Sequence, residues 1–231
     1  MAPPRRTRAT GRPGPRKGGG AIGAPQAIVP ARRSRPGGRS APRRRTAVRR
    51  YLIGMTGASG SAYGVDLIRR CPGEKYLVLS DWARQVLHSE TGLKPSDLES
   101  HVKRVFADSD LAAPFSSGSN RYDAFVVIPC SVSTLAKIAV GIADTLITRA
   151  AQVAMKERMR MVLCVRETPL SSIALENCLK LSREGVVIMP ISPPWYAGPK
   201  SLGDLVAGFT GKVLALLGER AGPGWREAEL D

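Results

Sequence analysis

The segment Tyr51-Leu52-Ile53-Gly54-Met55-Thr56-Gly57-Ala58-Ser59-Gly60 is the clearest structural signal in this chain. Its first five residues form a continuous apolar run, which is typical of a strand buried on both faces of a sheet. A glycine-rich turn follows directly. Residues 61–71 then carry apolar side chains at helical spacing, so the segment predicts a strand, a tight turn and a helix in succession.

The same alternation continues along the chain. Further apolar runs predict strands at 76–79, 124–128, 161–165 and 185–189, with Pro129 ending the 124–128 strand. Amphipathic patterns predict helices at 81–90, 131–140, 146–157, 171–183 and 202–217. Strands that alternate with helices indicate a Rossmann-like, three-layer α/β/α fold with a mostly parallel sheet. Ligands of such folds bind beyond the carboxyl ends of the strands.

The charge of the chain is unevenly distributed. The whole chain has 35 basic and 19 acidic residues, a net charge of +16, and residues 1–50 hold 15 of the basic residues and no acidic one. Subtraction leaves 20 basic and 19 acidic residues after residue 50. This near-neutral part lacks a basic surface interleaved with aromatic residues, so we expect no nucleic-acid binding by the folded domain.

Residues 1–50 also contain 8 prolines and 8 glycines, a composition that predicts a disordered extension. It is compatible with a nucleic-acid-binding arm, an organelle-targeting leader or a non-functional extension. The proline and glycine content disfavours the amphipathic helix of a transit peptide. The most apolar stretch, 21–31, is interrupted by Gly23, Pro25 and Pro30, and therefore predicts no membrane span.

The cysteines indicate a reducing compartment. Cys71, Cys130, Cys164 and Cys178 form no Cys-x-x-Cys pair, and Cys130 and Cys164 lie in apolar, strand-like runs. This pattern predicts neither a disulfide framework nor a zinc site. We therefore expect a cytoplasmic protein without a metal.

Small and hydroxyl residues follow three predicted strands: Gly57-Ala58-Ser59-Gly60, then Ser80, then Ser131-Val132-Ser133-Thr134. Such residues allow backbone N–H groups to approach an anion at a helix N-terminus, although they are also ordinary turn and cap residues. The first turn is not Gly-x-Gly-x-x-Gly, and Ser80 stands where a dinucleotide site needs a carboxylate for the ribose. The pattern therefore favours a mononucleotide such as FMN.

A second group of candidates carries charge. Arg149 and Lys156 are seven residues apart on one predicted helix, so they share a face, and Arg166-Glu167 directly follows a strand. Most such residues are solvated surface charges. Together with Tyr196 and Lys212, however, they have the chemistry that would hold an anionic phosphate substrate.

The sequence resembles the UbiX flavin prenyltransferase family. The resemblance extends over essentially all of residues 51–231 and is carried by an ordered series of motifs. These are Thr56-Gly57-Ala58-Ser59-Gly60, residues 129–139, Gly141-Ile142-Ala143-Asp144, Thr148-Arg149-Ala150-Ala151, Lys156-Glu157-Arg158, Arg166-Glu167-Thr168-Pro169-Leu170, Leu175-Glu176-Asn177 and Trp195-Tyr196.

The resemblance implies a metal-independent enzyme that assembles as a homo-oligomer of trimers, up to a dodecamer, with sites between subunits. It implies transfer of the dimethylallyl group of dimethylallyl phosphate to N5 and C6 of reduced FMN. The product, prenylated FMN, would serve UbiD-type decarboxylases.

By this resemblance each candidate residue has a role. The flavin contacts would be Gly57, Ala58, Ser59, Ser80, Ser131, Val132, Ser133, Thr134 and Arg166. The residues that bind dimethylallyl phosphate would be Arg149, Lys156, Arg166, Glu167, Tyr196 and Lys212. The catalytic residues would be Ser59, Glu90, Lys156 and Glu167, with Glu90 working alongside Ser59.

The chain departs from the family near Asp110-Leu111, where relatives often carry an aromatic side chain; Phe115 or Trp195 is then the candidate to stack on the allyl group. Gly224-Trp225-Arg226 would cover the site. Two alternatives are a flavin-dependent cysteine decarboxylase and a non-catalytic FMN-binding accessory subunit of an aromatic-acid decarboxylase. The first normally has a catalytic His and a Pro-x-Met-Asn segment; this chain has only His88 and His101, and has Arg166-Glu167-Thr168-Pro169 instead of that segment. The second would not need the phosphate-binding residues.

Overall fold

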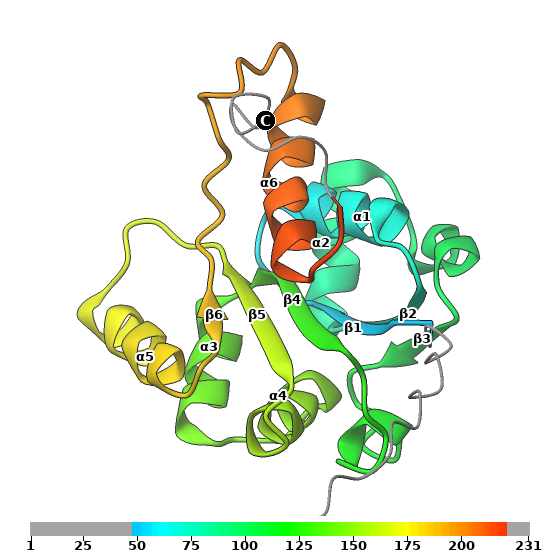
Figure 1. Ribbon diagram of the computed structural model, residues 1–231, viewed down its shortest axis with the longest axis vertical. Coiled ribbons are helices and arrows are strands. Elements are labelled where there is room, and N and C mark those ends of the chain that lie inside the picture. The colour runs from blue at the N-terminus through cyan, green and yellow to red at the C-terminus, as the bar shows by residue number, and fades with distance from the viewer. Residues whose placement is uncertain (1–47, 221–231) are drawn as a thin grey trace, which may run out of the picture. The chain divides into compact units, whose positions relative to one another are not determined.

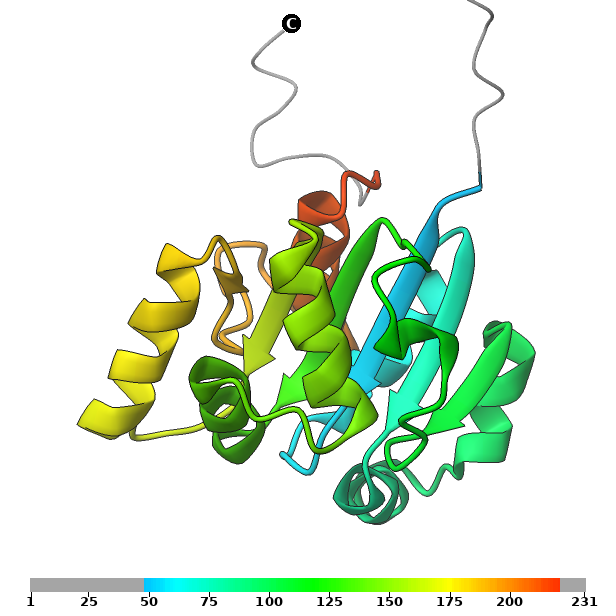
Figure 2. The same ribbon diagram turned by 90° about the horizontal axis from the view of Figure 1, so that it is seen from below.

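The computed structural model of the protein describes residues 48–220. Within them a six-stranded sheet has the order β3-β2-β1-β4-β5-β6, and every neighbouring pair is parallel (Figures 1 and 2). The strands are β1 (Arg50–Met55), β2 (Glu74–Leu79), β3 (Arg104–Ala107), β4 (Ala124–Cys130), β5 (Arg160–Val165) and β6 (Val187–Ile188). Residues 1–47 of the predicted extension (1–50) and the segment Gly224–Arg226 lie outside the described residues; Arg50, the last residue of that extension, begins β1.

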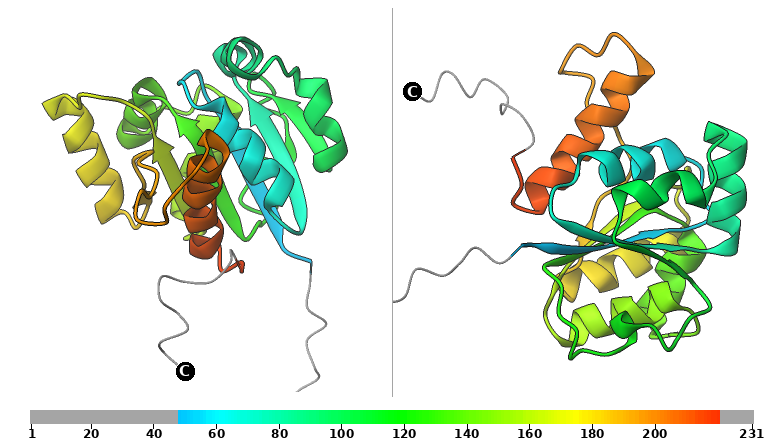
Figure 3. Two further views of the ribbon diagram at one scale, coloured as in Figure 1. Left: turned by 90° about the horizontal axis from the view of Figure 1, so that it is seen from above. Right: turned by 90° about the vertical axis from the view of Figure 1, so that its right-hand side faces the viewer.

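Helices cover both faces of the sheet, as Figure 3 shows. On one face lie α1 (Ser61–Arg70), α2 (Asp81–Thr91) and α6 (Leu202–Leu216), and on the other lie α3 (Val132–Val140), α4 (Leu146–Lys156) and α5 (Ser172–Arg183). Two short 3-10 helices, η1 (Pro95–His101) and η2 (Pro114–Ser116), flank β3. The predicted three-layer α/β/α fold is confirmed.

The apolar runs of the strands supply two separate cores. In β1, Ile53 packs into the core under α1 and α6, while its neighbour Leu52 packs into the core under α3 and α4. In β4, Val126 and Val127 divide between the same two cores. Successive side chains of a strand point to opposite faces, so a strand between two helical layers must be apolar at every position.

The structure corrects three details of the predicted elements. Pro129 does not end its strand: β4 continues to Cys130, and a register shift against β5 between Val127 and Cys130 accommodates a residue that has no N–H to donate. The strand β3 was not predicted, because it has only four residues at the edge of the sheet. The last strand spans 187–188 rather than 185–189.

Gly64 is where α1 comes closest to the sheet. A methyl group there would lie 2.7 Å from Met55 Cε and 2.8 Å from the Ile128 carbonyl oxygen. We predict that Gly64→Ala lowers the free energy of unfolding by about 1–3 kcal/mol, because the core cannot accept the extra volume. Urea unfolding at one fixed protein concentration measures this change.

The matched control is Gly203→Ala in α6. A methyl group there would meet only Ser201 Oγ, at an ordinary 3.5 Å. Alanine favours helices, so this variant should be neutral or more stable by up to about 1 kcal/mol. Equal losses of stability in the two variants would contradict the close packing of α1.

Candidate active site

The candidate site lies at the carboxyl ends of β1 and β4, where the strand order reverses. From β1 the chain proceeds to β2 and β3 on one side, while β4 leads to β5 and β6 on the other. The loops that leave β1 and β4 therefore diverge, and an opening remains between them. Open parallel sheets bind their ligands at such a position.

Thr56 joins the two loops across this opening. Its side chain is buried, and its hydroxyl donates a hydrogen bond to the Pro129 carbonyl oxygen at 2.9 Å. The same hydroxyl accepts a hydrogen bond from the Ser131 N–H at 2.8 Å, and the Thr56 N–H donates to Pro129 O at 3.1 Å. Three hydrogen bonds thus fix the start of the glycine-rich turn against the start of α3.

The glycines of the turn have separate reasons to be glycine. A side chain at Gly57 would collide with Cβ of Trp82, which lies on the first turn of α2. Gly60 has φ 106°, which is a conformation that side chains disfavour. The backbone at Gly57 therefore stays bare toward the opening, as a site that approaches a flavin closely requires.

Ser80 and Ser131 occupy equivalent positions as N-caps of α2 and α3. The Ser80 hydroxyl accepts from the Ala83 N–H at 3.1 Å, and the Ser131 hydroxyl accepts from the Thr134 N–H at 3.3 Å. Ser131 Oγ also donates to Thr134 Oγ1 at 3.1 Å. Two helix N-termini thus face the same edge of the sheet, where their remaining N–H groups favour an anion.

A cavity of about 360 Å³ lies between these loops. Predicted residues that line it are Gly57, Ser80, Ser131, Ser133 and Thr134; those that sequence reasoning missed are Thr56, Asp81, Trp82, Asp108, Lys137, Thr145 and Thr148. The exposed fraction of Trp82 is 69%. Its position two residues after Ser80 was the only available signal, since Asp108 and the threonines come from elements whose approach depends on the fold.

Larger cavities lie elsewhere, and position argues against them. One of about 550 Å³ is formed at the amino ends of β5 and β6 by residues such as Arg160 and Val187, and one of about 420 Å³ lies between α3, α4 and α5. Neither is at the carboxyl edge, where the strand-to-helix loops present their free N–H groups. The smaller cavity is therefore the better candidate for a mononucleotide.

The cavity contains both signs of charge. Burial raises the pKa of Asp108, an effect opposed by hydrogen bonds from the Ile147 N–H and the Thr145 hydroxyl and reinforced by the charges of Asp144 and Asp81. Lys137 forms an ion pair with Asp144 at 2.7 Å. An anionic ligand here would depend on neutral donors, namely hydroxyl and N–H groups. Within residues 48–220 no three His, Cys, Asp or Glu side chains gather as metal ligands.

Glu90 binds the turn from the end of α2. Its carboxylate accepts from the Gly60 N–H at 3.0 Å and from the Ser61 N–H at 2.8 Å. Partial burial works to raise the pKa of Glu90, but hydrogen bonds from the Ser59 hydroxyl and these two N–H groups outweigh it and lower the pKa. The Glu90 carboxylate thus lies beside the Ser59 hydroxyl as an acceptor, and the catalytic pairing of the two stays a prediction.

Arg166 and Glu167 lie where the sequence predicts, directly after β5 at the carboxyl edge. The Arg166 N–H donates to the Cys130 carbonyl oxygen at 3.0 Å, which holds this loop beside the one that leaves β4. Glu167 accepts from the Thr168 N–H at 2.9 Å. Both side chains are exposed and free to meet a ligand.

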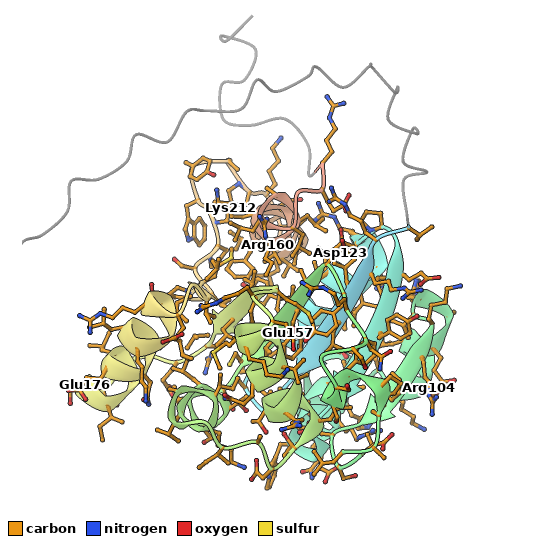
Figure 4. All side chains as sticks on the ribbon, turned by 60° about the horizontal axis from the view of Figure 1, so that its bottom comes forward. Arg104, Asp123, Glu157, Arg160, Glu176 and Lys212 are labelled. Carbon is orange, nitrogen blue, oxygen red and sulfur yellow. The ribbon has the colours of Figure 1, made fainter. Side chains whose placement is uncertain are left out.

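The other charged candidates do not converge with Arg166 within one chain. Lys156 ends α4 and precedes β5, so the six residues of β5, a span of about 20 Å, separate it from Arg166. Lys212 lies on α6, four residues before Leu216, whose carbonyl oxygen accepts a hydrogen bond from Arg160 at the amino end of β5; Figure 4 labels both Lys212 and Arg160. Arg149, in the first turn of α4, donates to the Ser116 carbonyl oxygen at 3.2 Å, and Tyr196 is 73% exposed.

The two candidate stacking aromatics differ in accessibility. Phe115 is only 6% exposed and packs edge-on against Tyr76, Phe106 and Tyr122. It supports the core beneath η2, so the prediction that it could stack on a substrate is wrong. Trp195 is exposed and remains the candidate to stack on the allyl group.

Comparison with known proteins decides the family. The flavoprotein family model matches residues 39–213. A flavin prenyltransferase UbiX of Thermoplasma acidophilum is 44% identical over 170 residues, which are 73% of this chain and 94% of that protein. The chain belongs to the UbiX family of flavoproteins.

Other relatives support the same family assignment. The mitochondrial flavin prenyltransferase PAD1 of Saccharomyces cerevisiae is 41% identical over 75% of this chain and 73% of that protein. The structure of AnUbiX (PadA1) in complex with FMN and dimethylallyl pyrophosphate is 41% identical, with a TM-score of 0.74 over 78% of this chain and 100% of that one. A dodecameric FMN-dependent UbiX-like decarboxylase from Escherichia coli O157:H7 is 42% identical, with a TM-score of 0.74 over 77% and 98%.

The contacts of Glu90 predict a pH-dependent contribution to stability. Because its pKa is lowered by folding, the stabilisation is fully present above the pKa of the unfolded chain and is lost as the pH falls through the folded value. We expect Glu90→Gln to lower the melting temperature at pH 7, and the difference from the unmodified protein to shrink as the pH is lowered below about 4.5. A difference that stays constant from pH 7 to pH 3.5 would contradict the assigned hydrogen bonds.

Proposed function

We propose that this protein is a flavin prenyltransferase, which transfers the dimethylallyl group of dimethylallyl phosphate to reduced FMN. Residues 51–231 form the catalytic domain. The observation that carries the proposal is the cavity between the β1 and β4 loops, with Arg166 and Glu167 on the neighbouring strand end. The relatives that this chain matches over most of its length are flavin prenyltransferases, and one of them holds FMN and a dimethylallyl donor.

The residues of the cavity suit FMN. The bare backbone at Gly57 admits close approach, and the hydroxyls of Ser80, Ser131 and Thr134 lie at helix N-termini, where a phosphate is favoured. Val132 and Ser133 form the first turn of α3 and offer N–H groups. When bound, reduced FMN supplies the nucleophilic carbon and nitrogen of the reaction; the chain has to hold it and place the prenyl donor against it.

The charged residues act on the leaving phosphate. As the carbon–oxygen bond of the donor breaks, negative charge grows on the phosphate, and the cations Lys156, Arg166 and Lys212 with the Tyr196 hydroxyl stabilise it. Arg149 adds a further donor. Glu167 gives a proton to the departing phosphate. Stabilising and protonating the leaving phosphate in this way requires cationic side chains and one acid, and no metal.

Ser59 and Glu90 remove the proton that is released when the new ring closes. The lowered pKa of Glu90 keeps it a carboxylate near neutral pH, ready to accept. Its hydrogen bond from the Ser59 hydroxyl provides the path from the turn to the carboxylate. Attachment at N5 and C6 of the flavin follows the family pattern and is part of the proposal.

The active enzyme is a homo-oligomer that completes its sites between subunits. In one chain Lys156 and Arg166 lie at opposite ends of β5, so both can serve one phosphate only if different copies supply them. Exposed apolar side chains on and beside α3, α5 and α6 support such contacts: Val140, Ile142, Ile173, Leu175, Leu179 and Leu202. The dodecameric relative supports assembly of several copies, and their arrangement as trimers is part of the proposal.

The product is a modified cofactor, so another enzyme must use it, and we propose a UbiD-type decarboxylase as the recipient. A reducing, cytoplasmic location accords with the four free cysteines, three of which are buried. No helix among the described residues is long and apolar enough to cross a membrane. Of the alternatives, cysteine decarboxylases share the fold at 20% identity, and an accessory subunit would have no use for Glu167.

The direct test is anaerobic incubation of the protein with reduced FMN and dimethylallyl phosphate, followed by mass spectrometry of the flavin. We expect a flavin heavier by one prenyl unit. Dimethylallyl pyrophosphate is assayed in parallel, since that donor is bound to AnUbiX. Glu167→Gln should lower the rate by about 10²–10⁴-fold if it donates the proton. A flavin of unchanged mass from well-folded protein would refute the function.

A mixing experiment tests whether subunits share the site. Lys156→Ala and Arg166→Ala should each lose most activity, by about 10²-fold or more, since each removes stabilisation of the leaving phosphate. Coexpression of the two variants creates some interfaces with both residues intact, so part of the activity should return. Coexpression of Lys156→Ala with Lys156→Ala carrying a different affinity tag is the control. Failure to regain activity in verified mixed oligomers would contradict the shared site.

A further inference from the structure

The end of α4 has an unusual geometry around Lys156. Neighbouring residues in a helix point in different directions, yet the Lys156 ammonium forms an ion pair with the carboxylate of the next residue, Glu157. This is possible because Glu157 is the C-cap, with φ −89° and ψ 3°, and has left the helix. The chain turns so that the carboxylate comes back to the ammonium.

The turn continues into a strained residue. Arg158 has φ 54°, and among residues 48–220 no other non-glycine residue has a positive φ. Branched and long side chains disfavour this left-handed conformation. A glycine or an asparagine would relieve it, so the strain indicates a local constraint that the surrounding structure maintains.

Gly118 leaves the space that the ion pair occupies. A methyl group there would collide with Glu157 Oε1 and lie 2.9 Å from Lys156 Nζ. Unlike seven other glycines, such as Gly141, Gly118 does not have a positive φ. Its backbone could therefore carry a side chain, and the reason for glycine at this position is room for Glu157 and Lys156.

The same loop contacts α4 at both of its ends. Arg121 donates through Nη2 to the Glu157 carbonyl oxygen at 3.4 Å, at the end of α4, and Arg149, in its first turn, donates to the Ser116 carbonyl oxygen at 3.2 Å. The hydrogen bond and charge of Lys156, with a smaller contribution from Arg121, lower the pKa of Glu157. Figure 4 labels Glu157 beside α4, and its side chain is half-buried.

We propose that Glu157 and Gly118 are positioning residues, which hold the Lys156 ammonium in the orientation that meets the phosphate of the prenyl donor in the site of a second copy. This inference rests on the proposed function. The side chain of a free lysine samples many rotamers, and fixing one before the substrate arrives removes that entropic cost from binding. A plain exposed ion pair at a helix end would contribute almost nothing.

Kinetic constants of matched variants separate the two possibilities. Glu157→Gln and Gly118→Ala should raise KM for dimethylallyl phosphate about tenfold, with kcat changed less and the dissociation constant of FMN unchanged. Glu157→Asp should recover part of the loss. Glu184→Gln, which neutralises an exposed carboxylate beside the same cavity as Lys156, is the control and should match the unmodified protein. Values for Glu157→Gln equal to those of Glu184→Gln would overturn the proposal.

A second readout does not depend on activity. The rate at which an amine-reactive acetylating reagent labels Lys156, followed by peptide mass spectrometry, should rise severalfold in Glu157→Gln and Gly118→Ala, because the ammonium is no longer held. An unchanged labelling rate would overturn the positioning role. A labelling contrast in a protein that transfers no prenyl group would support the positioning of Lys156 and refute the function proposed above.

Discussion

The hydrogen bonds of Thr56 are the interaction on which the rest of the site depends. One buried hydroxyl binds the loop after β1 to the loop after β4, donating to Pro129 and accepting from Ser131. A buried hydroxyl without hydrogen-bond partners costs free energy, and the Thr56 hydroxyl keeps both its partners only while the two loops stay together. The loops are therefore held in one arrangement. The bare backbone at Gly57 and the N-terminus of α3 then face the same cavity.

The second organising constraint is the direction of the chain. Because all six strands are parallel, α4 must return to the amino edge before β5 begins, which carries Lys156 away from the carboxyl edge where Arg166 lies. The topology that builds the candidate FMN cavity therefore prevents one copy from bringing together all the residues proposed to bind phosphate. In the proposed assembly different copies supply them, and the inferred role of the ion pair with Glu157 is to orient Lys156 for a site outside its own chain.

Much of the fold and of the candidate site could be predicted from the sequence alone. The apolar runs predicted the central strands, and the hydroxyl residues after three strands predicted the loops that line the cavity, since strand ends and caps have local signatures. Prediction failed where tertiary contacts decide. Phe115 was a plausible stacking group until its packing against Tyr76 and Phe106 placed it in the core. Asp108 and Thr145 reach the cavity only because β3 and α4 meet there, which no local pattern encodes.

The most direct test of this account is a structure of the oligomer with FMN bound. We expect flavin in the cavity between the β1 and β4 loops, with the hydroxyls of Ser80, Ser131 and Thr134 within hydrogen-bonding distance of it. We also expect Lys156 of another copy near Arg166. Flavin in the larger cavity at the amino ends of β5 and β6, beside Arg160, would contradict it.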